Sequence, residues 1–431
     1  MKYRVSRSML SGRVSAPGSK SLMQRFIAAA LLGRGTTVLR NPQESADAIA
    51  ALATAELLGA DLAQDQHGNY HITGGKMPPD QPLNVGESGL SMRLFTPIAA
   101  MSGFEVTITG EGSLLRRPID AFGPVFEAMG AHISTNNGHL PVTVKGPLTG
   151  GTCTLDGSVS SQFLSGLLMA LPLAKNDSTI EVKNLKSTPY IDMTLEVLEQ
   201  FGVVVTHKNY ERFHIPGNQH YRPTELVCEG DWSGAAALLV AAAMAGSSSN
   251  ATLGKNDDGV VVDNLETTYT QADSRITGVL MFAGARLLNR NGSISMHVPK
   301  LRGFEFDATD SPDLFPVLAA LATACDRPSR IAGVHRLKHK ESNRAEALVN
   351  EFSKAGITIR IENDELIVEP GVPIAAELNA HGDHRIAMAA ALLGLRSDGI
   401  TISGAEAVEK SFPEFFHILR ELGAEIRRIN E

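Results

Sequence analysis

One pattern of apolar and polar positions recurs six times along the chain: an amphipathic helical stretch ends at a glycine, and an apolar run follows. A glycine is typical of a helix C-terminus, because the residue that ends the helix adopts positive φ and glycine does so at little cost. Intervals of roughly 70 residues separate the copies, as in proteins built from internal repeats. The longest interval follows the third copy, so the repeats divide into three plus three. The glycines are Gly59, Gly130, Gly202, Gly284, Gly356 and Gly423.

Each repeat also contains a second, more apolar helix, with short strands between the helices. We expect the apolar helices at 19–32, 88–100, 161–173, 233–245, 312–324 and 383–395. We expect strands at 105–109, 179–182, 293–298 and 399–402. Strands that alternate with two helices in every repeat predict an α/β protein.

Polar motifs stand where the predicted helices begin. The N-terminus of a helix offers free N–H groups and a partial positive charge, so it attracts phosphate and carboxylate. If the repeats point these ends in one direction, they converge on one anion-binding cleft. The motifs are 17–21, 86–93, 158–163, 187–192, 231–234, 311–313, 340–344 and 382–385. The cations among them are Lys20, Arg25, Arg93, Lys340, Arg344 and Arg385.

Each motif taken alone has an ordinary structural alternative. A serine can be a helix cap, an arginine a solvated surface charge, and an acidic residue in a first turn a partner of the helix dipole. The glycines Gly86 and Gly89 form neither a P-loop nor a dinucleotide-binding fingerprint. An anion-binding role is favoured over these alternatives because basic and hydroxyl residues occur at the start of one helix after another in both halves of the chain. The alternatives apply to Arg25, Ser160, Ser161, Asp313, Glu341 and His384.

Composition narrows the class of protein. The chain has 431 residues, 43% of them hydrophobic, which is enough for two or three domains with substantial cores. The net charge is −8 and aromatic residues make up 5%, which argues against a nucleic-acid-binding protein. A few convergent cations can still form a local site for an anionic substrate on an acidic protein.

The cysteines and the apolar segments bear on the compartment. Cys153, Cys228 and Cys325 are far apart and form no CxxC motif, which favours a reducing compartment and disfavours a zinc site. We see no apolar signal-peptide core near Met1 and no run of about 20 apolar residues that would cross a membrane. We therefore expect a cytoplasmic protein without a membrane partner.

Nine short segments of the chain carry a more specific signal when they are taken together. They are Pro17-Gly-Ser-Lys-Ser21 with Arg25, Gly89-Leu-Ser-Met-Arg93, Arg117-Pro-Ile119, Ser160-Ser-Gln-Phe163, Ser187-x-Pro-Tyr-Ile-Asp192, Pro312-Asp313, Lys340-Glu-x-x-Arg344, Asp383-His-Arg385 and Lys410-x-Phe-Pro413. In sequence and in order, these segments resemble those of the 3-phosphoshikimate 1-carboxyvinyltransferase (EPSP synthase) family, which catalyses the sixth step of the shikimate pathway to aromatic amino acids.

The resemblance implies a fold of two similar domains, each made of three βαβαββ units in an inside-out α/β barrel, with the active site in the cleft between them. The N-terminal domain would span 17–228, and the C-terminal domain would combine 1–16 with 229–431. A crossover near 228–231 agrees with the longest interval between repeats. Because both substrates are multiply charged, we expect the domains to close over them.

The resemblance also implies a reaction and the residues that carry it. The enolpyruvyl group of phosphoenolpyruvate would pass to the 5-hydroxyl of shikimate 3-phosphate through a tetrahedral intermediate, and phosphate would leave. Asp313 would take the hydroxyl proton; Glu341, Lys20 and Lys410 are candidates for the other proton transfers. No metal or cofactor is implied, and we expect a monomer. Shikimate 3-phosphate would be held by Lys20, Ser21, Arg25, Ser160, Ser161, Gln162, Ser187, Asp313 and Lys340. Phosphoenolpyruvate would be held by Lys20, Gly89, Arg93, Arg117, Gln162, Arg344, His384, Arg385 and Lys410.

Some residues depart from the family pattern. Glu87 and Leu90 replace the usual Asn and Thr of the glycine loop, Leu94 replaces a common Pro, and Arg336 replaces a common Asn. These changes bear on affinity and on glyphosate sensitivity rather than on the reaction. A carboxylate at Glu87 would be unfavourable beside a phosphate unless it points away or pairs with an arginine.

Two rival functions are considered. The related enolpyruvyl transfer to UDP-N-acetylglucosamine usually uses a cysteine on a loop before the Arg-Pro segment, and here the first cysteine is Cys153, after that segment. A non-catalytic repeat protein, such as a ring clamp or an RNA-end-processing relative, is disfavoured by the acidic charge and the complete set of acid, base and cations.

Overall fold

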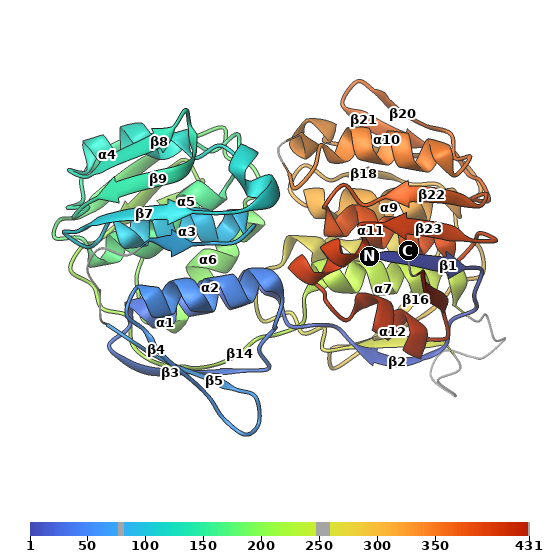
Figure 1. Ribbon diagram of the computed structural model, residues 1–431, viewed down its shortest axis with the longest axis horizontal. Helices are drawn as coiled ribbons and strands as arrows, with labels where there is room; N and C mark the ends of the chain where they lie inside the picture. Colours follow the sequence, from blue (N-terminus) through green and yellow to red (C-terminus); the bar gives the residue numbers. More distant parts are fainter. Residues whose placement is uncertain (76–81, 247–258, 339, 430–431) are drawn as a thin grey trace. The chain divides into compact units, whose positions relative to one another are not determined.

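The computed structural model describes residues 1–75, 82–246, 259–338 and 340–429. The chain divides into two compact units (Figure 1). The N-terminal unit comprises Gly18–Glu229 and Thr268–Gln271. The C-terminal unit comprises Met1–Pro17, Gly230–Thr267 and Ala272–Glu431. This division differs from the expected boundaries by one residue at each crossover and by the four residues 268–271, which no feature of the repeat pattern indicates.

The described residues form six four-stranded sheets, three in each unit, which share one topology. The first strand of each sheet pairs in parallel with the second. The remaining two strands form an antiparallel pair, one strand of which also pairs antiparallel with the second strand. In four of these sheets one helix connects the two parallel strands directly along the chain. In the other two, one strand of the parallel pair comes from a distant part of the sequence. The expected βαβαββ repeat is confirmed.

The N-terminal unit contains three of these repeats. The first consists of β14(Glu225–Val227), α1(Lys20–Leu32), β3(Gly35–Arg40), α2(Ala46–Leu57), β4(Asp61–Gln64) and β5(Tyr70–Gly74). The second consists of β6(Leu83–Asn84), α3(Gly89–Ala99), β7(Glu105–Thr109), α4(Gly123–Ala128), β8(His132–Asn136) and β9(His139–Lys145). The third consists of β10(Thr152–Asp156), α5(Gln162–Ala170), β11(Ser178–Lys183), α6(Pro189–Gln200), β12(Thr206–Lys208) and β13(Arg212–Ile215).

The C-terminal unit repeats the arrangement. Its first repeat consists of β2(Gly12–Ser15), α7(Trp232–Ala245), β15(Val260–Asp263), α8(Ile276–Phe282), β16(Arg286–Arg290) and β17(Ser293–His297). The second consists of β18(Glu305–Asp307), α9(Phe315–Thr323), β19(Ser329–Ala332), α10(Arg344–Lys354), β20(Ile359–Glu362) and β21(Glu365–Val368). The third consists of β22(Ala376–Asn379), α11(His384–Gly394), β23(Ile400–Ser403), α12(Phe415–Glu421), β24(Glu425–Ile429) and β1(Lys2–Ser6).

Three sheets are completed by strands from distant parts of the sequence. In the N-terminal unit, β14 pairs in parallel with β3. In the C-terminal unit, β2 pairs in parallel with β15, and β1 lies between β23 and β24. Figure 1 shows β1, in blue, beside the red strand β23. The N-terminal segment of the chain therefore belongs to the C-terminal unit. In each unit, one sheet contains strands from both the beginning and the end of that unit's sequence.

The more apolar helix of each repeat forms the core. In α3, α9 and α11 every residue is buried, as expected for helices that are apolar on all sides. Small residues allow close packing: a Cβ on Gly166 of α5 would lie 2.0 Å from the carbonyl oxygen of Arg93 in α3. The six repeat glycines have φ between 73° and 101°, which confirms the predicted helix ends.

Candidate active site

The first helix of the N-terminal unit, α1, begins with the cation Lys20. Ser19 caps α1, its hydroxyl accepting a hydrogen bond from the Leu22 N–H, and Lys20 is the first helical residue. The Lys20 Nζ atom lies 3.0 Å from the Asp47 Oδ2 atom of α2. Asp47 is a functional candidate that sequence analysis missed, since an acidic residue in a first turn is ordinarily a dipole partner.

Arg25 lies one turn further along α1 and is only 1% exposed. Its guanidinium donates to the Thr194 hydroxyl, 2.9 Å away, and to the carbonyl oxygens of Ser21 and Tyr190. Burial lowers the pKa of Arg25 to about 10, so the side chain stays charged at neutral pH. The surface alternative for Arg25 is therefore wrong.

Hydrogen bonds join the starts of the helices α1, α3 and α5. The buried Gln24 Oε1 accepts from the hydroxyls of Ser88 and Ser91, each at 3.0 Å. Arg93 Nη1 donates to the Gln162 Oε1 atom at 2.8 Å, and its guanidinium lies 4.7 Å from the centre of the Phe163 ring. Residues from three repeats therefore meet in the N-terminal unit, as the position of the polar motifs suggested.

The glycine loop leaves room for an arginine. A Cβ on Gly89 would lie 2.2 Å from the Nη1 atom of Arg117. Gly89 is also the first residue of α3, so the Arg117 guanidinium lies against the positive end of that helix. A guanidinium beside free N–H groups is a suitable anion-binding pair.

The predicted serines lie just before the helices α5 and α6, where Ser161 and Ser187 are buried. The Ser160 hydroxyl accepts from the Gln162 N–H at 3.3 Å, as the capping alternative expects, and Ser161 immediately precedes α5. Ser187 has φ of 57°, a left-handed conformation that is uncommon outside glycine. It precedes α6, which also carries Tyr190 and Thr194, the partners of Arg25.

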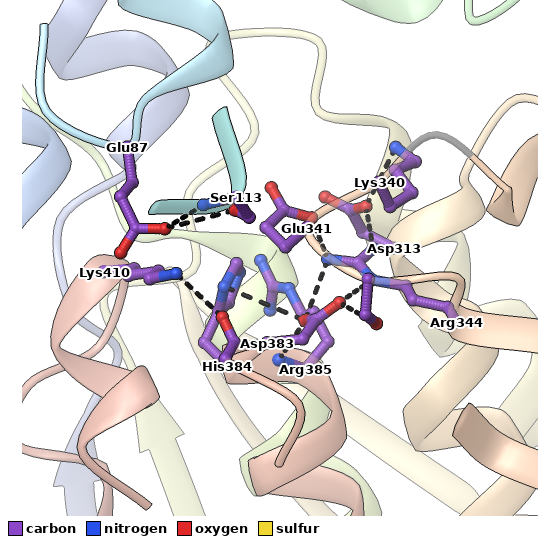
Figure 2. Close-up of polar contacts among 12 residues, drawn as sticks. Glu87, Ser113, Asp313, Lys340, Glu341, Arg344, Asp383, His384, Arg385 and Lys410 are labelled. Carbon is purple, nitrogen blue, oxygen red and sulfur yellow. Dashed lines mark hydrogen bonds and ion pairs between the residues drawn. The ribbon is translucent and has the colours of Figure 1, made fainter. Parts of the chain in front are cut away.

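Glu87 is directed toward a turn. Its Oε2 atom accepts hydrogen bonds from the Ser113 N–H at 2.9 Å and from the Ser113 hydroxyl at 3.2 Å (Figure 2). A Cβ on Gly112 would overlap the same carboxylate oxygen. The departure from the family's usual Asn is therefore accommodated by the turn at 112–113.

In the C-terminal unit, Arg344 is the centre of an ion network (Figure 2). It is the first residue of α10 and only 1% exposed. Its guanidinium lies 2.6 Å from Asp313 Oδ1, 2.7 Å from Glu341 Oε2 and 2.8 Å from Asp383 Oδ2. The expected base and one of the expected acids thus contact the same buried cation.

Asp313 is held as a carboxylate. It lies in a short helical turn, Pro312–Leu314, and also accepts a hydrogen bond from Lys340 Nζ at 3.2 Å. Burial raises the pKa of Asp313, but Lys340, Arg344 and Arg385 outweigh it and hold the pKa well below its usual range. Burial lowers the pKa of Lys340. The unliganded Asp313 carboxylate is therefore ionised and a weak base.

Asp383 is a second residue that sequence analysis left without a role. It is fully buried, caps α11 through the Arg385 N–H, and accepts from Arg344 at two nitrogens and from the Ser342 hydroxyl. The signal was present, since an aspartate before an apolar helix is a preferred cap. Its ion pair with α10 joins residues 39 apart and carries no local signal.

The remaining predicted residues lie around this network. Arg385 Nη1 donates to the Ser233 carbonyl oxygen at 2.9 Å, and His384 is buried at 2% exposure. Lys410 Nζ donates to the Gly382 carbonyl oxygen at 2.7 Å. Arg344, His384, Arg385 and Lys410 therefore gather around the start of α11 and the turn before it.

Asp273 is a third carboxylate that sequence analysis missed. It is 2% exposed, and within the described residues its Oδ1 atom has no hydrogen-bond partner. Burial and repulsion from Asp313 raise the pKa of Asp273 to about 7, against the attraction of Arg385. The C-terminal unit therefore combines an ionised carboxylate with one that titrates near neutrality.

The described part of the chain contains neither a metal-binding cluster nor a membrane-spanning helix. No group of three or more His, Cys, Asp or Glu side chains there could hold a metal ion. In the same ranges, no helix is sufficiently long and apolar for a membrane span.

Comparison with known proteins identifies the family. A family model described as EPSP synthase (3-phosphoshikimate 1-carboxyvinyltransferase) matches residues 5–419. A protein named 3-phosphoshikimate 1-carboxyvinyltransferase from Methanococcoides burtonii is 35% identical over 435 residues, which cover 99% of each chain. A protein of the same name from Halobacterium salinarum is 37% identical over 441 residues, again 99% of each chain.

Solved structures agree with the sequence comparisons. An EPSP synthase from Acinetobacter baumannii has a TM-score of 0.79 and 25% identity, and the match covers 99% of this chain and 100% of that one. The enolpyruvyl transferase NikO from Streptomyces tendae has the same TM-score at 17% identity, a likeness that shows the fold alone. Because the family model and relatives at 35% and 37% identity match nearly its whole length, the chain belongs to the EPSP synthase family.

Proposed function

We propose that the chain transfers the enolpyruvyl group of phosphoenolpyruvate to the 5-hydroxyl of shikimate 3-phosphate and releases phosphate, in the shikimate pathway to aromatic amino acids. Family membership supports this reaction. The observation that carries it is the buried Arg344, which contacts both Asp313 and Glu341, the residues proposed as base and acid.

In the proposed mechanism, Asp313 takes the proton of the attacking hydroxyl. Its low pKa makes it a weak base in the unliganded protein, because Lys340 and Arg344 stabilise its charge. Substrate phosphate and carboxylate groups bring further negative charge to these cations. That charge weakens their hold on Asp313 and raises its pKa toward a value suited to proton transfer.

Glu341 is the acid we favour for the methylene carbon of phosphoenolpyruvate. Its link to Arg344 places it in the same network as the base, so a proton lost at one carboxylate is compensated within that network. Lys20 and Lys410 remain candidates for the later proton transfer to the departing phosphate. When the tetrahedral intermediate collapses, phosphate leaves and the new methyl group loses a proton, which the Glu341 carboxylate takes back. Preplaced arginines stabilise the charge of the intermediate as it forms and collapses.

The N-terminal unit supplies the proposed shikimate 3-phosphate contacts. Arg25 brings a buried positive charge, and its hydrogen bonds go to hydroxyl and carbonyl groups. The hydroxyls of Ser160 and Ser161 lie at the start of α5. Arg93 and Arg117, which follow the glycine loop, are assigned to phosphoenolpyruvate because planar guanidinium groups suit carboxylate and phosphate.

We further propose a cytoplasmic protein that acts as a monomer. The three free cysteines are all buried, and burial raises the pKa of Cys153 and of Cys325 to about 11, so these thiols are unreactive. Free thiols suit a reducing compartment.

A phosphate-release assay tests the reaction. Purified protein with both substrates and a metal chelator should release inorganic phosphate, and omission of either substrate should stop the release. The proposal fails if no phosphate appears, or if release requires UDP-N-acetylglucosamine instead of shikimate 3-phosphate.

A further inference from the structure

The turn before α11 has a strained backbone. It follows β22, which ends at Asn379, and it leads into the capping residue Asp383. His381 has φ of 53° and Gly382 has φ of 65°. A left-handed conformation is uncommon for histidine, so the surrounding contacts must hold it in place.

The carboxylate of Glu351 contacts this turn. Glu351 lies on α10 and is 2% exposed. Its Oε2 atom accepts from the Asn379 N–H at 2.9 Å, and its Oε1 atom lies 2.7 Å from His381 Nε2. Lys354 Nζ also donates to both oxygens. Four contacts to one buried carboxylate make this a specific attachment rather than a surface ion pair.

Electrostatics favours an ionised Glu351. Burial raises the pKa of Glu351, but the hydrogen bonds from Lys354, Asn379 and His381 lower it by more. The net result is a pKa below the usual value. A charged acceptor makes stronger hydrogen bonds than a neutral one. Glu351 is therefore a charged acceptor at neutral pH.

Helix α10 holds the turn at two points. Arg344, at its start, binds the Asp383 carboxylate, and Glu351 binds Asn379 and His381. Residues seven apart lie on the same face of a helix, two turns along. Between these points lies Gly382, whose carbonyl oxygen accepts from Lys410.

We propose that Glu351 and His381 form a latch, a pair of positioning residues that fixes the turn 379–383 and thereby places Asp383, Arg385 and Lys410. The latch rests on the proposed function, because those residues belong to the proposed active site. Neither Glu351 nor His381 needs to touch a substrate. A displacement of about 1 Å at a reacting group costs about 100-fold in rate, so a loosened turn should impair chemistry.

The test uses the full-length protein and four variants. His381→Ala removes the side-chain donor, whereas His381→Gln offers an N–H in its place. Glu351→Gln removes the charge. The control is Glu346→Gln, which removes an exposed carboxylate from the same helix α10. Thermal melting confirms that each variant folds before it is assayed.

Two measurements are made on each variant. Steady-state kinetics should show kcat reduced about 10-fold to 100-fold in His381→Ala and in Glu351→Gln. KM for shikimate 3-phosphate should stay within about twofold, His381→Gln should recover most of the kcat, and Glu346→Gln should match the wild type. Amide hydrogen exchange without substrates should be faster at 380–383 in His381→Ala and Glu351→Gln only.

The outcomes separate the latch from the reaction. If the wild type lacks the transfer activity but exchange at 380–383 responds as described, the proposed function fails and the attachment of the turn stands. If exchange and kcat in His381→Ala match the wild type, the latch is overturned. It is also overturned if His381→Gln is as impaired as His381→Ala, since the donor would then not be the cause.

Discussion

Arg25 and Arg344 are both 1% exposed, one in each unit, yet their surroundings differ. Within the described residues, Arg25 is bound by hydroxyl and carbonyl groups and by no carboxylate. Arg344 is bound by three carboxylates. Burial lowers the pKa of Arg25 to about 10, whereas the carboxylates raise the pKa of Arg344 well above its usual value despite burial.

The difference teaches which unit suits which task. A buried cation held by neutral dipoles keeps an unbalanced charge, which is an advantage when a permanent anion binds. A cation surrounded by carboxylates is already balanced, and the same cation sets the pKa values of the carboxylates that would transfer protons. This contrast supports the proposal that the N-terminal unit binds shikimate 3-phosphate and that the C-terminal unit carries out proton transfer.

The largest expected effect is on the Arg344 network. Arg344→Met should abolish turnover and reduce the free energy of unfolding by about 3–5 kcal/mol, because it removes the cation from the fully buried Asp383 and from the partly buried Asp313 and Glu341. Denaturant unfolding monitored by circular dichroism measures the stability. A loss below about 1 kcal/mol would contradict the balanced-network description.

Asp313→Ala tests the base within that network. Turnover should fall about 100-fold to 10,000-fold, the range expected for loss of a general base. Binding of shikimate 3-phosphate, measured by calorimetry, should persist, since Lys340 and Arg25 remain. Surviving turnover would place the base elsewhere, and Asp273 would be the next candidate because its pKa is about 7.

Arg25→Met examines the other side of the comparison. The KM for shikimate 3-phosphate should rise about 100-fold, as expected for loss of a buried charge-assisted contact. The free energy of unfolding should change by less than about 1 kcal/mol, because the substitution also removes the cost of burying an unbalanced charge. A stability loss as large as that of Arg344→Met would contradict the proposed difference between the two arginines, in which Arg25 is unbalanced and Arg344 is balanced by carboxylates.

Acid should affect the network through Asp313. Its folded-state pKa is well below the usual value, so its contribution to stability is present above the unfolded pKa of about 3.9 and is lost as pH falls. Unfolding free energies measured from pH 6 to pH 3 should therefore decline more steeply for the wild type than for Asp313→Asn. Parallel curves would show that Asp313 is not held by its cations.

The sequence was sufficient for the repeat architecture because that signal is local. The six glycines that end helices, and the apolar helices that precede or follow them, depend on neighbouring residues, and the structure has them where the pattern predicts. The motif at 340–344 likewise placed Arg344 among the cations at helix starts, whereas the role expected of Glu341 came from the resemblance to the family.

Contacts between distant residues were beyond that reasoning. Asp383 meets Arg344 across 39 residues, and Glu351 meets His381 across 30, and neither pair has a periodic signature. The four residues 268–271 join the N-terminal unit through contacts such as those of Thr268 and Tyr269 with the Glu229 carboxylate. Such pairings follow from the folded topology, which a pattern of apolar positions does not determine.

The smallest effect is expected at the glycine loop, where Gly89→Ala sharpens the account of the N-terminal cations. The new Cβ would lie 2.2 Å from Arg117 Nη1, so the guanidinium must move. Since it is the end of a flexible side chain, the move should cost less than about 1 kcal/mol of stability. KM for phosphoenolpyruvate should rise about 10-fold, or about 1.4 kcal/mol, because the displaced guanidinium no longer matches the ligand.

Steady-state kinetics with Ala99→Gly, a buried position at the other end of α3, as the matched control separates this effect from general loosening of the helix. An unchanged KM would mean that Arg117 does not bind phosphoenolpyruvate, and the division of cations between the two substrates would need to be redrawn.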